Sequence, residues 1–600
     1  MLLVLDAEIR VRARRSTRPD IGGLISLAQP EGFANGIIWE PNHTAAFECL
    51  GLDFDVVCIC DPNSAMLQAH TGRLGRIEEE EQEGLLARED EFSVGSDQDD
   101  LELIQLQHGE AKDVLPFNTQ RRGPHWGIHK LRPRQLRSLR HRILRAYLVV
   151  VTLISCMLLT CAIFFPSYSD PPQRYHALRR RVDEEPYQQG RANPDNQKVF
   201  IAASLYDAKG KLVSGDWGRS VKGLIRILGP ENVYLSIYQN DADDESRIAL
   251  NDFRRRVSCN ASIVVEELDV SQLNHVTNAN GERKLKRMAF LAEVRNRALR
   301  PLTDSTSPAS QTRFDRLLYV NDVVFDPVDA ANLLFSTNVD EATGMTQYRA
   351  ACATDFINPV KFYDTFATRD LDGYGMGVPF YPWFSNAGNG ASRQDVLAQK
   401  DAVRVKSCWG GLVAYEARWF QPWPPAQPEL NHTTSEAMQS PLRFRAENET
   451  YWEASECCLI HADLSALAPE QLGVGETGIV MNPYVRVAYS RSSLDWLPFT
   501  RRFERLYTPA QALVNWIAKL PNFNPRRAEQ PGQKVEDRLW VWHSSSLHTD
   551  AQKGHGGYEE VTRTPAPGSF CGRKGLSYID EQSADGKRKW GNEQLPADLG

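Results

Sequence analysis

The chain has 600 residues, of which 42% are hydrophobic and 24% are charged, with a formal net charge of -8. This length exceeds what one ordinary domain needs and predicts a large domain with additional segments. The charge balance gives no reason to expect nucleic acid as a partner, since surfaces that bind nucleic acid carry a basic excess.

Residues 1–145 are predicted to form a cytoplasmic N-terminal region without a recognisable domain. Met66 is a candidate alternative start, which leaves open whether residues 1–65 belong to the mature protein. Residues 77–110 are rich in Asp and Glu, which is typical of a solvated, disordered segment. The last part of the region, residues 121–145, is basic and contains no Asp or Glu.

Residues 146–165 contain no charged side chain, and Pro166 ends this apolar run. Twenty residues at a rise of about 1.5 Å span the hydrocarbon core of a bilayer, roughly 30 Å thick. We therefore predict a transmembrane helix over residues 146–166. Lys and Arg mark the cytosolic side of a span, and here they dominate the flank before it. The predicted topology is that of a type II membrane protein with a luminal C-terminal part.

Cysteines and glycosylation sequons after the span agree with a lumen. The cysteines are even in number, as disulfide-bonded proteins often have them: Cys259, Cys352, Cys408, Cys457, Cys458 and Cys571. Their pairing cannot be deduced from the sequence, although the adjacent Cys457 and Cys458 are not expected to pair with each other. Asn260, Asn431 and Asn448 each begin an Asn-X-Ser/Thr sequon and are candidate glycosylation sites.

Two further segments are expected to lie outside the main domain. Residues 167–197 are rich in Pro, Arg and Gln and predict a luminal stem that lifts the next domain off the membrane. Residues 525–600 are rich in Arg, Gln, Gly, Ser and Pro and predict a partly disordered tail, in which only residues 539–543 look ordered.

Between these segments, residues 198–524 alternate between strand and helix patterns. Strands are predicted over residues 199–207, 232–240, 261–268 and 317–325, and helices over residues 217–228 and 283–302, with a further helical stretch ending at Arg256. This alternation predicts an α/β fold with a parallel sheet covered by helices on both faces. Ligands bind at the carboxyl ends of the strands in such sheets.

The fourth predicted strand contains Asn321 and Asp322 within an otherwise apolar run. A carboxylate in such surroundings is costly unless it is paired or bound to a cation, so Asp322 is a candidate metal ligand and catalytic residue, with Asn321 beside it. The alternative is a strand end at which Asn and Asp open a turn, and this stretch alone favours that alternative.

Residues 406–415 place Gly410 and Gly411 beside Trp409. A pair of glycines lets a ligand approach the backbone closely, and the face of a Trp ring suits a sugar, so these three residues are candidate substrate contacts. A tight turn beside a core Trp explains the same pattern equally well.

Residues 452–464 bring Glu453 and Glu456 in front of His461. His461 is a candidate metal ligand, since imidazole and carboxylate together suit Mn²⁺ better than Mg²⁺. Glu453 and Glu456 are candidates for orienting an acceptor hydroxyl or accepting its proton. A salt-bridge partner and a core histidine are the alternative interpretation of this cluster.

In the predicted helix over residues 283–302, Asn296 lies on the apolar face and needs hydrogen-bond partners, which are strand ends or a ligand. Arg283, Arg287 and Arg295 are candidate partners of a diphosphate, although a solvated helix face accounts more simply for most of these charges.

Three motifs together resemble the fungal capsule-associated α-1,3-mannosyltransferases, glycosyltransferase family 69: VNDVVF (320–325), SCWGGLVAYEA (407–417) and WEASECCLIHADL (452–464). IAASLYD (201–207) and GPENVYLSIYQN (229–240) are similar to the family's opening strands. The resemblance implies a GT-A-type fold with a Rossmann-like, mostly parallel sheet and a Golgi location. It also implies GDP-mannose as donor, a glycan acceptor, Mn²⁺ or Mg²⁺ as cofactor, and retention of configuration.

Two positions depart from the family pattern. Ser204 stands where the family usually has Asn, and Gln239 where it has Glu. The missing carboxylate at residue 239 puts a contact to the donor's nucleoside in doubt. Two alternatives to mannosyl transfer therefore stay open: a transferase that uses another nucleotide sugar, and a non-catalytic factor for polysaccharide assembly or export on the same fold.

Overall fold

The computed structural model describes residues 48–52, 55–59, 133–421, 441–467, 477–544, 554–580 and 589–596, with the backbone alone for residues 48–52, 55–59, 133–140, 544, 554 and 589. The chain divides into two compact units, Met1–Gly72 and Arg73–Gly600. In the first unit, strands β1 (Glu48–Leu52) and β2 (Asp55–Ile59) form an antiparallel pair. All other elements belong to the second unit.

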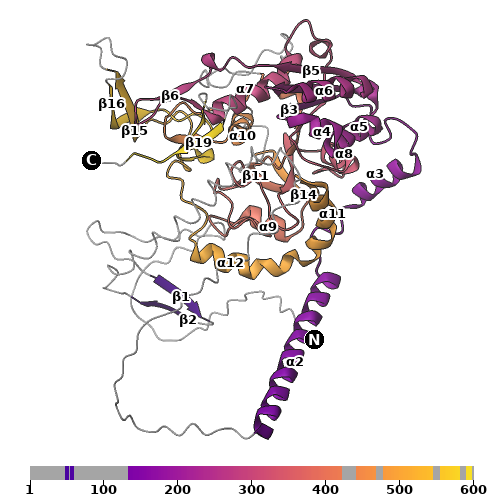
Figure 1. Ribbon diagram of the computed structural model, residues 1–600, viewed down its shortest axis with the longest axis vertical. Coiled ribbons are helices and arrows are strands. Elements are labelled where there is room, and N and C mark those ends of the chain that lie inside the picture. Colours follow the sequence, from indigo (N-terminus) through magenta and orange to yellow (C-terminus); the bar gives the residue numbers. More distant parts are fainter. Residues whose placement is uncertain are drawn as a thin grey trace, which may run out of the picture. The chain divides into compact units, whose positions relative to one another are not determined.

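A nine-stranded sheet organises the described part of the second unit, in the order β10-β11-β14-β9-β12-β8-β3-β4-β5 (Figure 1). Strands β3 (Val199–Leu205), β4 (Val233–Asn240), β5 (Asn260–Glu266) and β8 (Arg316–Val320) run parallel. Strand β12 (Leu412–Glu416) is antiparallel to both β8 and β9 (Ala350–Phe356), and β14 (Ile479–Ala488) is parallel to β9. Strands β11 (Val403–Ser407) and β10 (Arg369–Asp370) complete the edge.

Alternate residues of the central strands enter two different hydrophobic cores, one on each face of the sheet. Along β8, Leu317 and Tyr319 join one core, and Leu318 and Val320 join the other. Helix α7 (Arg287–Leu299) covers the first face, and α5 (Asp216–Leu228) and α8 (Pro327–Phe335) cover the second. The prediction of an α/β fold with a mostly parallel sheet covered on both faces is therefore confirmed.

The other helices of the domain are α4 (Lys211–Ser214), α6 (Asp244–Arg256), α9 (Ala391–Leu397), α10 (Glu456–Leu467), α11 (Arg491–Thr500) and α12 (Tyr507–Ile517). Before the domain, α2 (Pro133–Phe164) contains a stretch, His141–Phe164, that is long and apolar enough to cross a membrane by length and composition. Its apolar side chains are exposed, as expected of a helix that does not belong to a protein core.

The prediction of one helix over residues 283–302 is wrong at its start. Strand β7 (Arg283–Lys286) precedes α7 and pairs with β6 (His275–Thr277) and β18 (Leu576–Asp580). With β19 (Lys589–Glu593) these strands form a second, four-stranded sheet. Pairing with a segment almost 300 residues away overrides the local helical spacing.

The expected stem is part of the domain in the described structure. Helix α3 (Gln173–Glu184) buries Tyr175, Leu178 and Val182, and the guanidinium of Arg174 pairs with Asp401. Residues 167–197 therefore do not form a spacer that lifts the domain away, because an apolar face of this segment packs on the sheet's second core.

In the described part of the predicted tail, order extends beyond residues 539–543. Strand β17 (Gly572–Lys574) pairs with β13 (Trp452–Ala454), β18 pairs with β7, and β15 (Val535–Ser544) forms a hairpin with β16 (Gly554–Arg563). A disulfide joins Cys571 to Cys458 of α10. The sequence offers little local hydrophobic signal here because these strands derive their stability from partners distant in the chain.

Candidate functional site

The residues after β8 are fixed by their backbone. The Asn321 N–H donates to the carbonyl of Gly411 at 2.9 Å, and Trp217 Nε1 of α5 donates to the Asn321 carbonyl at 2.8 Å. Asn321 and Asp322 thus follow the carboxyl end of a central parallel strand, which is the edge at which such sheets bind ligands.

Arg295 connects three elements at this edge. Its Nη1 donates to Asn321 Oδ1 at 3.0 Å, and its Nε donates to Glu456 Oε1 at 2.9 Å. The guanidinium lies over the ring of Trp409, 4.5 Å from its centroid, and near Tyr319 at 5.6 Å. Arg295 of α7 therefore ties the end of β8 to the first residue of α10 and to the loop before β12.

Asp322 differs from its neighbours because its carboxylate makes no hydrogen bond to another residue in the part of the chain that the structure describes. Burial raises its pKa, and the nearby Arg295 guanidinium opposes that rise. A half-buried carboxylate that no other residue donates to retains its capacity to bind a cation or a proton.

The loop before β12 is held against the sheet. Asp364 Oδ2 accepts hydrogen bonds from the backbone N–H groups of Trp409, at 2.9 Å, and Gly410, at 3.3 Å. Gly410 and Gly411 both have positive φ, and a Cβ at Gly410 would lie 2.0 Å from the Ala353 carbonyl oxygen. The glycines therefore allow close packing of backbone on backbone. One face of Trp409 is occupied by Arg295.

The two glutamates of residues 452–464 lie in different surroundings. Glu456 begins α10 and pairs with Arg295. Glu453 lies in β13, where its Oε1 is 3.5 Å from Lys286 Nζ and accepts from the Ser577 N–H at 3.4 Å. Burial raises the pKa of Glu453, and Lys286 opposes this. Glu456 thus belongs with Arg295 and Asn321, whereas the contacts of Glu453 join β13 to the second sheet.

His461 has the contacts of a packed residue. It is fully buried in α10, its ring stacks on Tyr415 at 5.5 Å, and its Nδ1 accepts from the Cys408 N–H at 3.5 Å. Burial lowers its pKa to about 3, so the imidazole is neutral at physiological pH. Tyr415 pairs with Leu317, near the start of β8 rather than at its carboxyl end. The predicted role of His461 as a metal ligand stays a prediction.

The other predicted substrate contacts point to structural partners. Arg283 is exposed on β7, and Arg287 lies 4.7 Å from the centroid of the Trp590 ring. Asn296 exchanges two hydrogen bonds of 2.8 Å with the backbone of Phe444. Each of these side chains stabilises the packing of α7 or β7, so Arg295 is the member of the predicted set that joins Asn321.

Asn260 and Asn448, the sequon residues within the described parts, are both exposed, as a glycosylation site must be. Asn431 lies outside the described residues.

The sequence did not indicate the supporting residues Asp364 and Asp207. Asp207 follows β3 and accepts hydrogen bonds from the N–H groups of Leu212 and Val213 at the start of α4, at 2.8 and 3.0 Å. Gln239 Nε2 donates to the Asp207 carbonyl at 3.1 Å. A Gln at position 239 can supply this N–H, which a Glu cannot. No motif marks Asp364, since its two donors, the N–H groups of Trp409 and Gly410, are distant in sequence.

Metal ligands are sparse at the strand end. The described residues contain no group of three or more His, Cys, Asp or Glu side chains placed to hold a metal ion. Asn321 Oδ1 accepts from Arg295, so Asp322 is the free carboxylate of the site. A single carboxylate fits a divalent ion that takes its remaining ligands from substrate phosphates and water, as Mg²⁺ commonly does.

Comparison with known proteins defines the class. Residues 198–463 match the profile of the family described as Cryptococcal mannosyltransferase 1. Residues 198–463, less than half of the chain, therefore carry the profile of a mannosyltransferase family, which supports a glycosyltransferase. The domain has a mixed α/β fold with a large, mostly parallel central sheet.

Similar solved structures include the mannosyltransferase PcManGT from Pyrobaculum calidifontis in complex with GDP-Man and Mn²⁺, at 11% identity and a TM-score of 0.27, covering 63% of this chain and 77% of that one. Mannosyl-3-phosphoglycerate synthase from Rubrobacter xylanophilus is 12% identical with a TM-score of 0.24, covering 67% and 94%. S. aureus TarS 1–349 with UDP-GlcNAc is 10% identical with a TM-score of 0.23, covering 49% and 59%. None of the curated proteins matches the chain significantly.

Proposed function

We propose that the protein transfers mannose from GDP-mannose to a glycan hydroxyl in α-1,3 linkage. The observation that supports this proposal most is the carboxylate of Asp322 at the carboxyl end of β8. It lies near Arg295, within the residues that match the mannosyltransferase family. GDP-mannose is α-linked, so an α product requires retention of configuration.

In this proposal Asp322 holds Mn²⁺ or Mg²⁺ on the donor's diphosphate. The ion, when bound, offsets negative charge that develops on the leaving GDP. Arg295 contributes positive charge nearby and fixes Asn321 and Glu456, while the loop of Trp409, Gly410 and Gly411 shapes the boundary between donor and acceptor. Glu456 is the acidic group best placed to act near the anomeric carbon, because it shares Arg295 with Asn321.

The proposed location is the Golgi lumen, behind a single type II span. The apolar stretch His141–Phe164 and the basic flank before it support this topology. The disulfides Cys352–Cys408 and Cys458–Cys571 support an oxidising compartment. Cys259 and Cys457 remain free thiols.

A non-catalytic role in polysaccharide assembly or export is the second candidate. The observation that favours it is the single free carboxylate, since GT-A enzymes usually supply two to their metal. A different nucleotide-sugar donor is the third candidate. It rests on Gln239, whose amide binds the Asp207 backbone.

A donor comparison separates the three candidates. The full chain, purified in detergent, is given radiolabelled GDP-mannose, UDP-glucose or UDP-GlcNAc with Mn²⁺ and α-mannoside acceptors. We expect transfer from GDP-mannose alone, reduced strongly by EDTA and restored by Mn²⁺. Transfer from another donor alone would retain the transferase and replace the donor, whereas no transfer and no release of nucleotide from any donor would contradict enzymatic activity.

A further inference from the structure

Two helices after β14 expose large apolar side chains to solvent. Helix α11, the short helix η9 (Arg501–Leu506) and helix α12 follow one another, and α12 lies at the periphery of the domain (Figure 1). We call their exposed side chains the apolar platform: Trp496, Phe499, Leu513, Val514, Trp516 and Ile517. Trp516 is 76% exposed and Phe499 is 54% exposed. Single exposed apolar residues are common on protein surfaces, whereas a group of large ones marks an interaction site.

Helix α12 is amphipathic, but its polar face is turned toward the protein and its apolar face toward solvent. Its polar side chains face the protein: Gln511 Oε1 accepts from Arg393 Nη1 at 2.6 Å, and Asn515 Oδ1 accepts from the Val378 N–H at 2.7 Å. Its outward face carries the large apolar residues, and residues 507–517 contain no charged side chain. A helix that faces water shows the opposite arrangement, so the outward face of α12 matches an apolar phase.

Aromatic side chains extend the platform along α11 and η9. The rings of Trp496 and Phe499 meet edge to face at 5.7 Å, and Phe499 meets Phe503 in the same way at 5.3 Å. Arg502 of η9 is exposed, and so is Lys519, two residues after the end of α12. Trp and Phe next to basic residues are typical of helices that lie in the plane of a membrane interface, where basic side chains reach the lipid phosphates.

The segment just after α2 is hydrogen-bonded to η9, between the two helices of the platform. The Ser167 N–H donates to the Arg501 carbonyl at 3.1 Å, and Arg501 Nη1 donates to the Tyr168 carbonyl at 2.9 Å. Ser167 lies three positions after Phe164, the last residue of α2, a reach of roughly 10 Å at full extension. A span that ends there therefore brings η9, and with it α11 and α12, to the bilayer surface.

We infer that the platform inserts into the interface of the bilayer that α2 crosses and holds the catalytic domain directly on the membrane. The partner is the lipid surface, because the platform is continuous with the end of the span and because its outward face is apolar with basic residues at its margin. The inference requires α2 to be a span and is independent of the transferase chemistry.

Lipid-phase photolabelling of the full chain tests this inference. The protein is reconstituted in phosphatidylcholine vesicles that contain a phosphatidylcholine with a diazirine in its acyl chain, illuminated, digested and mapped by mass spectrometry. Peptides of α2 serve as the internal positive control. We expect label on peptides of α11 and α12 in addition to α2, since both lie within the apolar phase.

Two variants make the result specific. Phe499→Glu combined with Trp516→Glu is expected to reduce the label on α11 and α12 by at least about fivefold, since charged residues oppose insertion, and to leave the label on α2 unchanged. Ile248→Glu on α6, where the isoleucine is 64% exposed, is the matched control and should change nothing. A shared thermal-unfolding midpoint confirms that all three proteins fold.

Label confined to α2 in the unmodified chain would overturn the inference. Lipid label that the double glutamate variant does not reduce would overturn it as well. Crosslinks between the α12 segments of two copies, in place of lipid label, would show instead that the platform is an interface between protein chains.

Discussion

Replacing Arg295 with Met is expected to abolish transfer and to destabilise the domain. Arg295 is the buried partner of Glu456, and it donates to Asn321 Oδ1. The substitution leaves the Glu456 carboxylate buried without its cation, a change that typically costs about 3–5 kcal/mol of folding free energy. It also frees the strand end and the start of α10, and a displacement of about 1 Å at a reacting site can lower the rate roughly 100-fold.

Arg297 offers a matched control on the same helix. It pairs with Glu293 and with Glu266 at the surface, at 25% side-chain exposure, so Arg297→Met should change stability by no more than about 1 kcal/mol. The double variant Arg295→Met, Glu456→Gln removes the unpaired charge and should recover part of the stability without recovering transfer. Equal effects of Arg295→Met and Arg297→Met on the unfolding midpoint and on transfer would contradict the assigned role.

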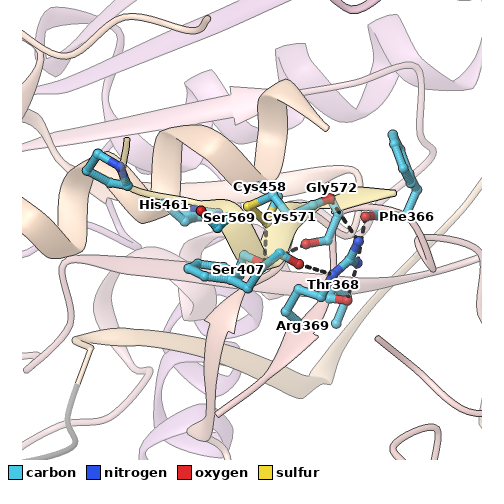
Figure 2. Close-up of a disulfide and its surroundings, with 12 residues drawn as sticks. Phe366, Thr368, Arg369, Ser407, Cys458, His461, Ser569, Cys571 and Gly572 are labelled. Atoms are coloured by element: carbon cyan, nitrogen blue, oxygen red, sulfur yellow. Dashed lines mark hydrogen bonds between the residues drawn. A yellow bond between two sulfur atoms is a disulfide. The ribbon is translucent and has the colours of Figure 1, made fainter. Parts of the chain in front are cut away.

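Removing the disulfide between Cys458 and Cys571 is the second change with a large expected effect. The disulfide joins cysteines 113 positions apart in the sequence. Loss of a native disulfide typically costs about 2–5 kcal/mol of folding free energy. The disulfide fixes the segment that Arg369 also holds (Figure 2). The Nη2 of Arg369 donates to the Cys571 carbonyl at 3.0 Å, and its Nε donates to the Phe570 carbonyl at 3.0 Å. Replacing both cysteines with Ala should lower the unfolding midpoint and expose the chain after residue 568 to limited proteolysis.

Cys259→Ala is the appropriate control, because Cys259 is a free, half-buried thiol just before the edge strand β5. It should retain the midpoint and the proteolytic pattern of the unmodified chain. If the double alanine variant remained as resistant as this control, the C-terminal strands would be held by strand pairing alone, and the disulfide would have no stabilising role.

The central strands could be predicted from the sequence because their signal is local. The apolar runs of β3, β4 and β8 are buried on both faces, so their periodicity needs no knowledge of a partner. Strand β7 and the strands of the C-terminal region could not be predicted, since each is short and acquires its conformation from pairing across a long sequence separation. The stem was misjudged for a related reason: the apolar residues of α3 become evident only when the core that they contact is known.

The candidate site could likewise be predicted only in part from the sequence. The sequence identified Asn321, Asp322, Arg295 and Glu456 as candidates, and the structure brings Asn321, Arg295 and Glu456 into direct contact. It could not show that Arg287, Asn296 and Glu453 have partners in the protein itself, because a polar residue in an apolar run looks alike whether it binds a ligand or a backbone carbonyl. The prediction that these carboxylates and His461 share the chemistry stays a prediction, and Asp322 and Glu456 are the acidic groups that we propose for it.

Binding of GDP-mannose to the Asp322→Ala variant tests the central claim most directly. Calorimetry on the full chain in detergent, with and without Mn²⁺, compares it with Asp252→Ala, which removes an exposed carboxylate paired with Arg255 on α6. The account predicts that Asp322→Ala weakens Mn²⁺-dependent binding by at least about tenfold while Asp252→Ala binds normally, because a metal ligand contributes at least as much as the groups that support it. Equal, Mn²⁺-dependent binding by both variants would contradict the assignment of the donor site to the end of β8.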